Sequence, residues 1–166
     1  MTLLRWMVRI AAVLALLVAA LFLGARLHDG PLGPIPGGPL EAGALVSDPV
    51  GDWSFAKDVG EVELQLDSQD RSRITWILVD DGQAYVPCSL GFPPGKSWYR
   101  DAAKDGRAVL RIEGKRYPVE LAKLDDAAAQ QLGGVLRAEI ERKYGRMPPS
   151  DSGVWIFRVS SRPPAS

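Results

Sequence analysis

The chain has 166 residues, which is enough for one compact domain and a smaller appendage. It carries 20 Lys and Arg residues against 20 Asp and Glu residues, so it has no basic surplus to neutralise the phosphates of DNA or RNA. Its single cysteine, Cys88, and its single histidine, His28, exclude a disulfide framework, a clustered Cys/His metal site and a histidine-based catalytic triad. Redox or transfer chemistry in this chain therefore depends on a bound cofactor or on carboxylates.

Residues 1–28 are predicted to form a membrane anchor. Residues 10–23 are all apolar, and with their flanks they make a helix long enough to cross the hydrocarbon core of a bilayer, about 30 Å. Arg5 and Arg9 precede the apolar run and favour a cytoplasmic N-terminus, whereas Arg26 after it opposes that orientation. The prediction is a single-pass inner-membrane protein whose domain faces the periplasm. The alternatives are a cleaved signal peptide with a secreted domain, and a domain that faces the cytoplasm.

Residues 29–43 are predicted to form a linker, because four prolines and five glycines exclude a regular helix or an interior strand. Leu32, Ile35 and Leu40 give this spacer an apolar side that can pack against the domain. A phosphate-binding loop is the weaker interpretation, because no strand precedes the glycines and no Gly-Lys-Ser/Thr follows them.

Residues 44–162 are predicted to form one β-rich domain. Residues 61–67 (EVELQLD) alternate apolar and polar side chains, as in a strand with one buried face. Residues 73–79 (RITWILV) are mostly apolar and rich in β-branched side chains, which predicts a strand buried on both faces. Asp81-Gly82 predicts a hairpin turn, after which residues 83–87 return as the next strand.

The second half of the domain repeats the hairpin pattern. Residues 107–113 and 116–124 flank a turn at Gly114-Lys115, and residues 154–160 form a last strand. With one helix between them, these six strands indicate a mainly β (α+β) fold, a small antiparallel split β-barrel with one or two helices. The alternative is a four-stranded sheet packed on one helix.

The helix is predicted over residues 125–144. Asp125 or Asp126 caps its start, and Gly145 ends it. Its expected apolar stripe consists of Leu132, Val135, Leu136 and Ile140.

The segment 94–107 (PGKSWYRDAAKDGR) has two interpretations. In the first it is a short crossover helix capped by Ser97, with Trp98 as a core plug and Lys96 in solvent. In the second, Lys96 lies beside a bound phosphate, Ser89 supplies a hydroxyl group, and Arg73 completes a cationic clamp.

Two runs of sequence resemble the flavin-binding split-barrel superfamily, that is, the pyridoxamine-5'-phosphate-oxidase-like proteins and the deazaflavin-dependent nitroreductases. They are RSRITWILVDDGQAYV (71–86) and KSWYRDAAKDGRAVLRIEGKRYPVELAKL (96–124), and the resemblance covers about residues 53–144. It implies a homodimer that holds flavin mononucleotide, or as second choice deazaflavin, at the subunit interface. The cofactor-binding residues that it implies, by position, are Arg73, Thr75, Ser89, Lys96 and Trp98. It implies no catalytic residue and no metal site.

The sequence also departs from the superfamily. Residues 87–94 lack the basic residue that often follows the strand, and the substrate-binding histidine and arginine of true pyridoxamine phosphate oxidases have no counterparts. Oxidation of pyridoxine phosphates is therefore not expected. Two hypotheses for function follow: a membrane-anchored, flavin-dependent oxidoreductase of unknown substrate, and a non-catalytic envelope scaffold or partner-binding module that has lost the cofactor.

Overall fold

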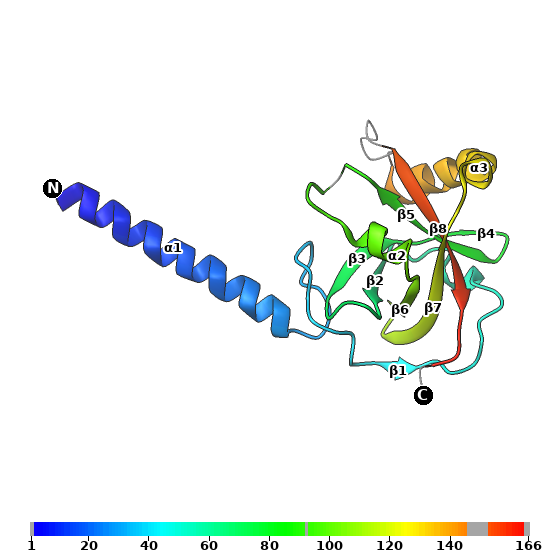
Figure 1. The fold of residues 1–166 in the computed structure, drawn as a ribbon, viewed down its shortest axis with the longest axis horizontal. Helices are drawn as coiled ribbons and strands as arrows, with labels where there is room; N and C mark the ends of the chain where they lie inside the picture. Colours follow the sequence, from blue (N-terminus) through cyan, green and yellow to red (C-terminus); the bar gives the residue numbers. More distant parts are fainter. Residues whose placement is uncertain (1, 92, 146–152, 165–166) are drawn as a thin grey trace.

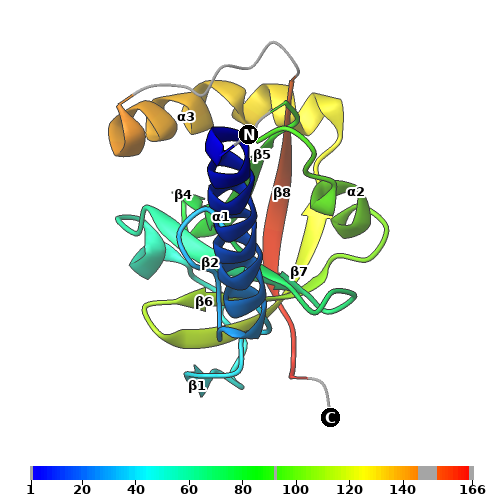
Figure 2. The same ribbon diagram turned by 90° about the vertical axis from the view of Figure 1, so that its left-hand side faces the viewer.

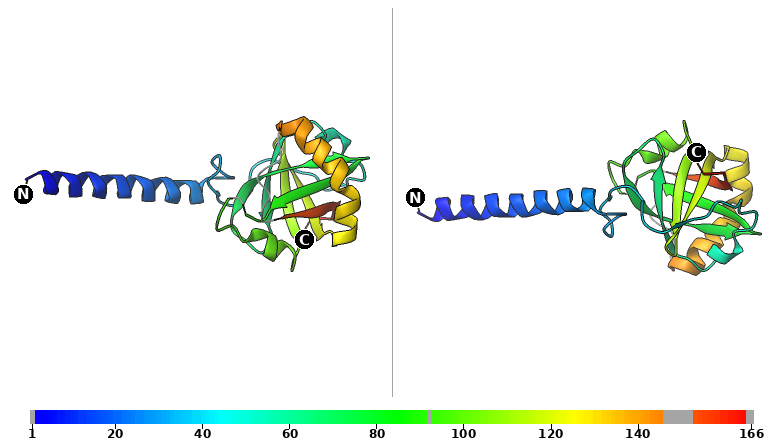
Figure 3. Two further views of the ribbon diagram at one scale, coloured as in Figure 1. Left: turned by 90° about the horizontal axis from the view of Figure 1, so that it is seen from above. Right: turned by 90° about the horizontal axis from the view of Figure 1, so that it is seen from below.

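The computed structural model describes residues 2–91, 93–145 and 153–164. An N-terminal helix, α1 (Thr2–Leu27), projects away from the rest of the molecule, and the remaining elements gather at its C-terminal end (Figures 1 and 3). Within the described residues α1 is the one helix long and apolar enough to cross a membrane, and its side chains are exposed over almost its whole length. An exposed apolar helix at the N-terminus is typical of membrane anchors and of signal sequences.

The strands form one antiparallel sheet in the order β3-β2-β6-β7-β8-β5-β4, and the short β1 pairs with β7 in parallel. Their bounds are β1 (Ala44–Leu45), β2 (Glu61–Leu66), β3 (Ser72–Trp76), β4 (Leu78–Asp80), β5 (Gln83–Ser89), β6 (Arg107–Ile112), β7 (Lys115–Lys123) and β8 (Val154–Ser161). The two ends of this order, β3 and β4, are joined through Ile77 alone, and β3 also contacts β5. The sheet therefore curls into a half-barrel, and the predicted fold class is confirmed.

The core lies inside the curl. On β2 the side chains of Val62, Leu64 and Leu66 are buried, which confirms the alternation predicted for residues 61–67. The strand predicted over residues 73–79 is interrupted at Ile77, which belongs to neither β3 nor β4. Burial on both faces is confirmed for residues 77–79, whereas Ile74 on the edge strand β3 is 36% exposed.

Three helical segments accompany the sheet: the 3-10 turn η1 (Ser54–Ala56), α2 (Trp98–Ala102) and α3 (Asp126–Tyr144). The predicted caps of α3 are confirmed: the Asp125 side chain accepts a hydrogen bond from the Ala128 amide at 2.8 Å, and Gly145 has a positive φ of 71°.

Helix α3 covers the outer face of the sheet near β4, β5 and β8 (Figure 2). Leu136 and Ile140 are buried there, whereas Val135 is 47% exposed, so its place in the predicted stripe is wrong. The Lys143 ammonium donates hydrogen bonds at 2.9 Å to the carbonyl oxygens of Val59 and Ile77, so it ties α3 to the junction between β3 and β4.

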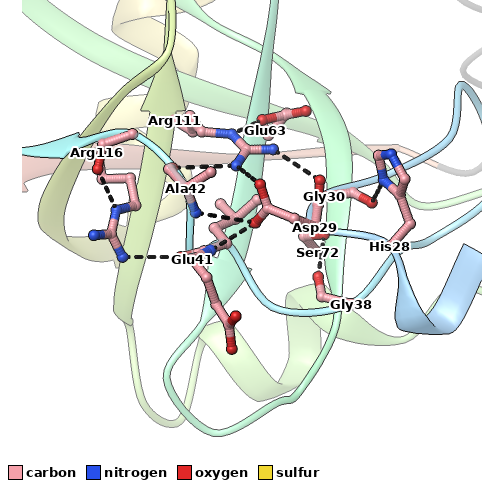
Figure 4. Close-up of polar contacts among 12 residues, drawn as sticks. His28, Asp29, Gly30, Gly38, Glu41, Ala42, Glu63, Ser72, Arg111 and Arg116 are labelled. Carbon is pink, nitrogen blue, oxygen red and sulfur yellow. Dashed lines mark hydrogen bonds and ion pairs between the residues drawn. The ribbon is translucent and has the colours of Figure 1, made fainter.

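The segment between α1 and β1 packs along the sheet (Figure 4). Arg111 on β6 donates to the Asp29 carboxylate at 2.7 Å and also bonds to Glu63 on β2. The Leu40 side chain is buried, and its amide donates to the Gln65 side chain at 2.7 Å. The end of α1 is thereby fixed against β2 and β6.

Candidate functional site

A cavity of about 580 Å³ lies between β3, the end of β5, the loop before α2, and the segment that follows α1. This volume is in the range of small-molecule sites. Four of the five predicted site residues line the cavity, namely Arg73, Thr75, Lys96 and Trp98. Ser89 is not among its lining residues. Its hydroxyl group is buried, and within the described part of the chain it has no hydrogen-bond partner.

The cavity wall is strongly cationic. Arg26, Arg71, Arg73 and Lys96 line it, and Asp70 is the single carboxylate among the described lining residues. Another cavity, beside the β4–β5 turn and α3, has the opposite character, because three carboxylates and two cations are among its described lining residues. The charge of the first cavity thus favours an anionic ligand, and that of the second does not.

Arg73 lies deepest among the cations of this wall. Its guanidinium group contacts the Gln69 side chain and lies 5.6 Å from the centre of the Trp98 ring. Its Nε is fully buried and has no partner among the described residues. Burial lowers the pKa of Arg73 to about 10, and the nearby Asp101 carboxylate opposes this shift. Arg73 thus stays charged at neutral pH and keeps one donor unsatisfied, which is costly unless a ligand supplies an acceptor.

Lys96 lies beside Cys88, so the interpretation of Lys96 as a solvated loop residue is wrong. Burial raises the pKa of the Cys88 thiol, and a hydrogen bond with Lys96 together with the charge of Arg73 only partly counters this. The thiol therefore stays protonated at neutral pH and is a poor nucleophile. The contribution of Lys96 to the cavity is its positive charge.

Trp98 combines two predicted features. Its side chain is buried and packs against Phe157 at 5.8 Å between ring centres, which confirms the core plug. Trp98 also lines the cavity, where the Arg73 guanidinium group lies over its ring. Ser97 occupies the position before α2, but its side chain makes no capping hydrogen bond, so that prediction is wrong.

Several lining residues were not predicted. Gln69 connects two parts of the wall, because its amide bonds to Arg73 and donates to Asp101 at 2.8 Å. Arg26 and the prolines at 34 and 36 reach the cavity because the segment after α1 folds back onto β3. No local sequence signal identifies Arg26 and these prolines, since the β3 residues that they meet in the cavity are more than 30 positions away in the chain.

No protein-family model and no curated protein matches the chain. The solved structures that are similar to it include the following two. A NimC/NimA family protein from Clostridium acetobutylicum has 15% identity over 63% of this chain and 75% of that one, with a TM-score of 0.41. An F420 reductase has 14% identity over 71% of this chain and 97% of that one, with a TM-score of 0.43.

At these identities and TM-scores the two likenesses tell nothing about the residues, cofactor or activity of this chain. The split-barrel fold rests on the strand order and curl of its own sheet. Its cavity combines a cationic wall, the Trp98 ring and a buried donor of Arg73 that has no partner among the described residues.

Proposed function

We propose that the chain is a membrane-anchored, flavin-binding split-barrel protein and that the cavity beside β3 holds flavin mononucleotide, with deazaflavin as the second choice. The observation that carries this proposal is the buried, unpartnered Nε of Arg73 in a cationic wall. A phosphate supplies the acceptor that this donor lacks, and it suits a planar guanidinium group better than water does.

Different residues of the cavity are proposed to bind the phosphate and the ring system of the flavin. Arg73 and Lys96 supply the charge for a phosphate, and Thr75 lies on the same strand, where it can bond to the edge of the ring system. Trp98 offers an aromatic surface. Ser89 has a buried hydroxyl group without a partner and is proposed as a further donor to the cofactor.

A bound flavin would supply hydride and electron transfer, which the side chains of this cavity cannot supply. The described lining residues include no imidazole and one carboxylate, and the Cys88 thiol is protonated. The part of the protein is therefore to bind and orient the cofactor and to balance its charge. The substrate class of such an oxidoreductase is not defined by these residues.

The anchoring and assembly are part of the same proposal. The exposed, apolar α1 is proposed to span the inner membrane once, with the domain in the periplasm, because Arg5 and Arg9 precede the apolar run. A homodimer is proposed from the sequence resemblance alone.

The second candidate is a non-catalytic module on the same barrel. The network that joins Arg73, Gln69 and Asp101 favours it, because such a network can stabilise the fold without any ligand. In that case Arg73 is a structural residue, and the cavity holds no flavin.

An absorption spectrum of the full-length chain, extracted in mild detergent, separates the two candidates. The flavin proposal predicts either the visible bands of an oxidised flavin in the purified protein or their appearance in the bound fraction after incubation with flavin mononucleotide. A folded, colourless protein that also fails to take up added flavin mononucleotide and deazaflavin would support the non-catalytic module instead.

A further inference from the structure

The mouth of the cationic cavity lies at the end of α1. We propose that this outer part of the cavity, formed by Arg26 and Arg71, binds the phosphate headgroup of an anionic membrane lipid. The inference rests on the membrane anchoring in the proposed function, but it does not depend on a flavin. The lipid phosphate would be a second ligand, separate from the one that is proposed to bind deeper in the cavity at Arg73 and Lys96.

The first step is that α1 and β3 are joined rigidly at the cavity mouth. The Gly38 amide donates to the His28 carbonyl oxygen at 2.9 Å. The Ser72 hydroxyl donates to the Gly38 carbonyl oxygen at 2.6 Å (Figure 4). A Cβ atom at Gly38 would lie 2.7 Å from the Arg26 carbonyl oxygen, so only glycine allows this close approach. The backbones of Arg26 and of Ser72, which lies between Arg71 and Arg73, are thus held at a fixed separation.

A second contact prevents rotation about this junction. Asp29 accepts hydrogen bonds from the Glu41 amide at 2.7 Å and from Arg111 at 2.7 Å, and Arg111 also bonds to Glu63 in the sheet (Figure 4). The domain therefore cannot swing freely on α1. One side of it, the side with the cavity mouth, stays next to the plane where the helix leaves the membrane.

The length of α1 sets the depth of Arg26. Arg5 and Arg26 are 21 residues apart, which corresponds to about 31 Å along a helix. The hydrocarbon core of a bilayer is about 30 Å thick. When α1 spans it, the Arg26 guanidinium group reaches the layer of lipid phosphates, and the residues that share its cavity lie at the same level or just outside it.

The positive charge near the membrane surface comes from the cavity and not from the net charge of the chain. The whole chain has equal numbers of acidic and basic residues, so its overall charge does not attract it to an anionic surface. Among the described residues that line the cavity, four are cations and one, Asp70, is a carboxylate. Arg26 and Arg71 are both exposed at the mouth, and guanidinium groups bind phosphate in a bidentate manner. Because the anchored chain places Arg26 and Arg71 at the level of the lipid phosphates, a lipid headgroup is a nearer ligand for them than a phosphate dissolved in water.

The test uses the full-length chain in lipid nanodiscs of phosphatidylcholine with a minor fraction of phosphatidylglycerol. Native mass spectrometry then counts the lipids that stay on the released protein. We expect phosphatidylglycerol to be retained in preference to phosphatidylcholine. The double variant Arg26→Gln/Arg71→Gln should lower the retained fraction by roughly tenfold or more, since each charge-assisted contact is worth about a factor of ten.

Two further double variants serve as controls for Arg26→Gln/Arg71→Gln. Arg137→Gln/Arg158→Gln removes two exposed cations outside this cavity and should retain the lipid as the wild type does. Arg26→Lys/Arg71→Lys keeps the two positive charges and should retain more lipid than the double Gln variant. That difference would show that the double Gln variant loses lipid through its lost charge.

Three outcomes would overturn the inference. They are equal retention of both lipids, equal losses in the two double Gln variants, and displacement of the lipid by millimolar inorganic phosphate, which would make the site one for a free anion. A chain that does not enter the nanodisc at all refutes the anchoring itself. A chain that enters without retaining phosphatidylglycerol refutes only the lipid site.

Discussion

Arg73 is the residue whose replacement separates a binding role from a structural one. Arg73→Met keeps an unbranched side chain of similar length but removes the charge and all donors. If the buried Nε awaits a ligand, the variant loses affinity for flavin mononucleotide while the free protein keeps its stability.

The expected effect on stability is small because gains and losses cancel. The free protein loses the contact with Trp98, about 0.5–2 kcal/mol, and the hydrogen bond to Gln69, about 1 kcal/mol. It gains relief from a buried unsatisfied donor, about 1–3 kcal/mol. The free energy of unfolding should therefore change by no more than about 2 kcal/mol in either direction. The lost contact to phosphate should cost about 1.5–3 kcal/mol, which is roughly 10- to 150-fold in Kd.

The assay has two readouts on the same detergent-solubilised protein: the melting temperature without ligand, and the Kd for flavin mononucleotide from quenching of flavin fluorescence. Arg158→Met, at an exposed position of β8, is the control and should change neither. A strong loss of stability together with unchanged affinity would show that Arg73 serves the fold and would refute the reasoning.

Three further predictions follow from the same contacts. Lys96→Ala should weaken binding of flavin mononucleotide by roughly tenfold or more, whereas Lys104→Ala, on the exposed end of the crossover, should not; equal Kd values in a fluorescence titration would remove Lys96 from the site. Gly38→Ala should destabilise the junction between α1 and the sheet by about 1–3 kcal/mol, because its Cβ would lie 2.7 Å from a carbonyl oxygen of α1. Hydrogen exchange of residues 36–40 should then accelerate, whereas Gly51→Ala, where the added Cβ meets open space, should leave it unchanged. Partial burial acts to raise the pKa of Asp29, but hydrogen bonds from two linker amides and from an arginine on β6 outweigh it and lower that pKa below its ordinary value. The stability that Asp29 contributes is therefore fully present above pH about 4 and is lost as the pH falls through its lower, folded-state pKa. Exchange at the linker amides should rise over that range in the wild type and show no such step in Asp29→Asn.

The parts of the fold that depend on local periodicity could be predicted from the sequence. Alternation over residues 61–67 identified β2 and its buried face, and Asp125 and Gly145 gave both ends of α3. The run 73–79 was predicted as one strand because a continuous apolar pattern carries no sign of an interruption. The interruption at Ile77 lies where Lys143 donates a hydrogen bond to the Ile77 carbonyl oxygen, a tertiary contact that periodicity does not reveal.

The sequence likewise predicted only those residues of the candidate site whose positions depend on local strand or helix patterns. Arg73 and Thr75 share one face of β3 by strand parity, and Trp98 opens the crossover helix, so these residues meet in one cavity. Ser89 does not line it, although Pro87, on the same face of β5, does. The role of Arg26 depends on a segment that folds back over the sheet, which no spacing in the sequence reveals.

The most direct test of the proposed cofactor site compares flavin mononucleotide with riboflavin, which has the same ring system but no phosphate. Binding of both ligands to the full-length wild type and to Arg73→Met is measured by fluorescence titration. A phosphate held by Arg73 predicts that the wild type prefers flavin mononucleotide by roughly tenfold or more and that the variant loses this preference. Equal affinity of the wild type for the two ligands, or no binding of either, would contradict a flavin phosphate site in this cavity.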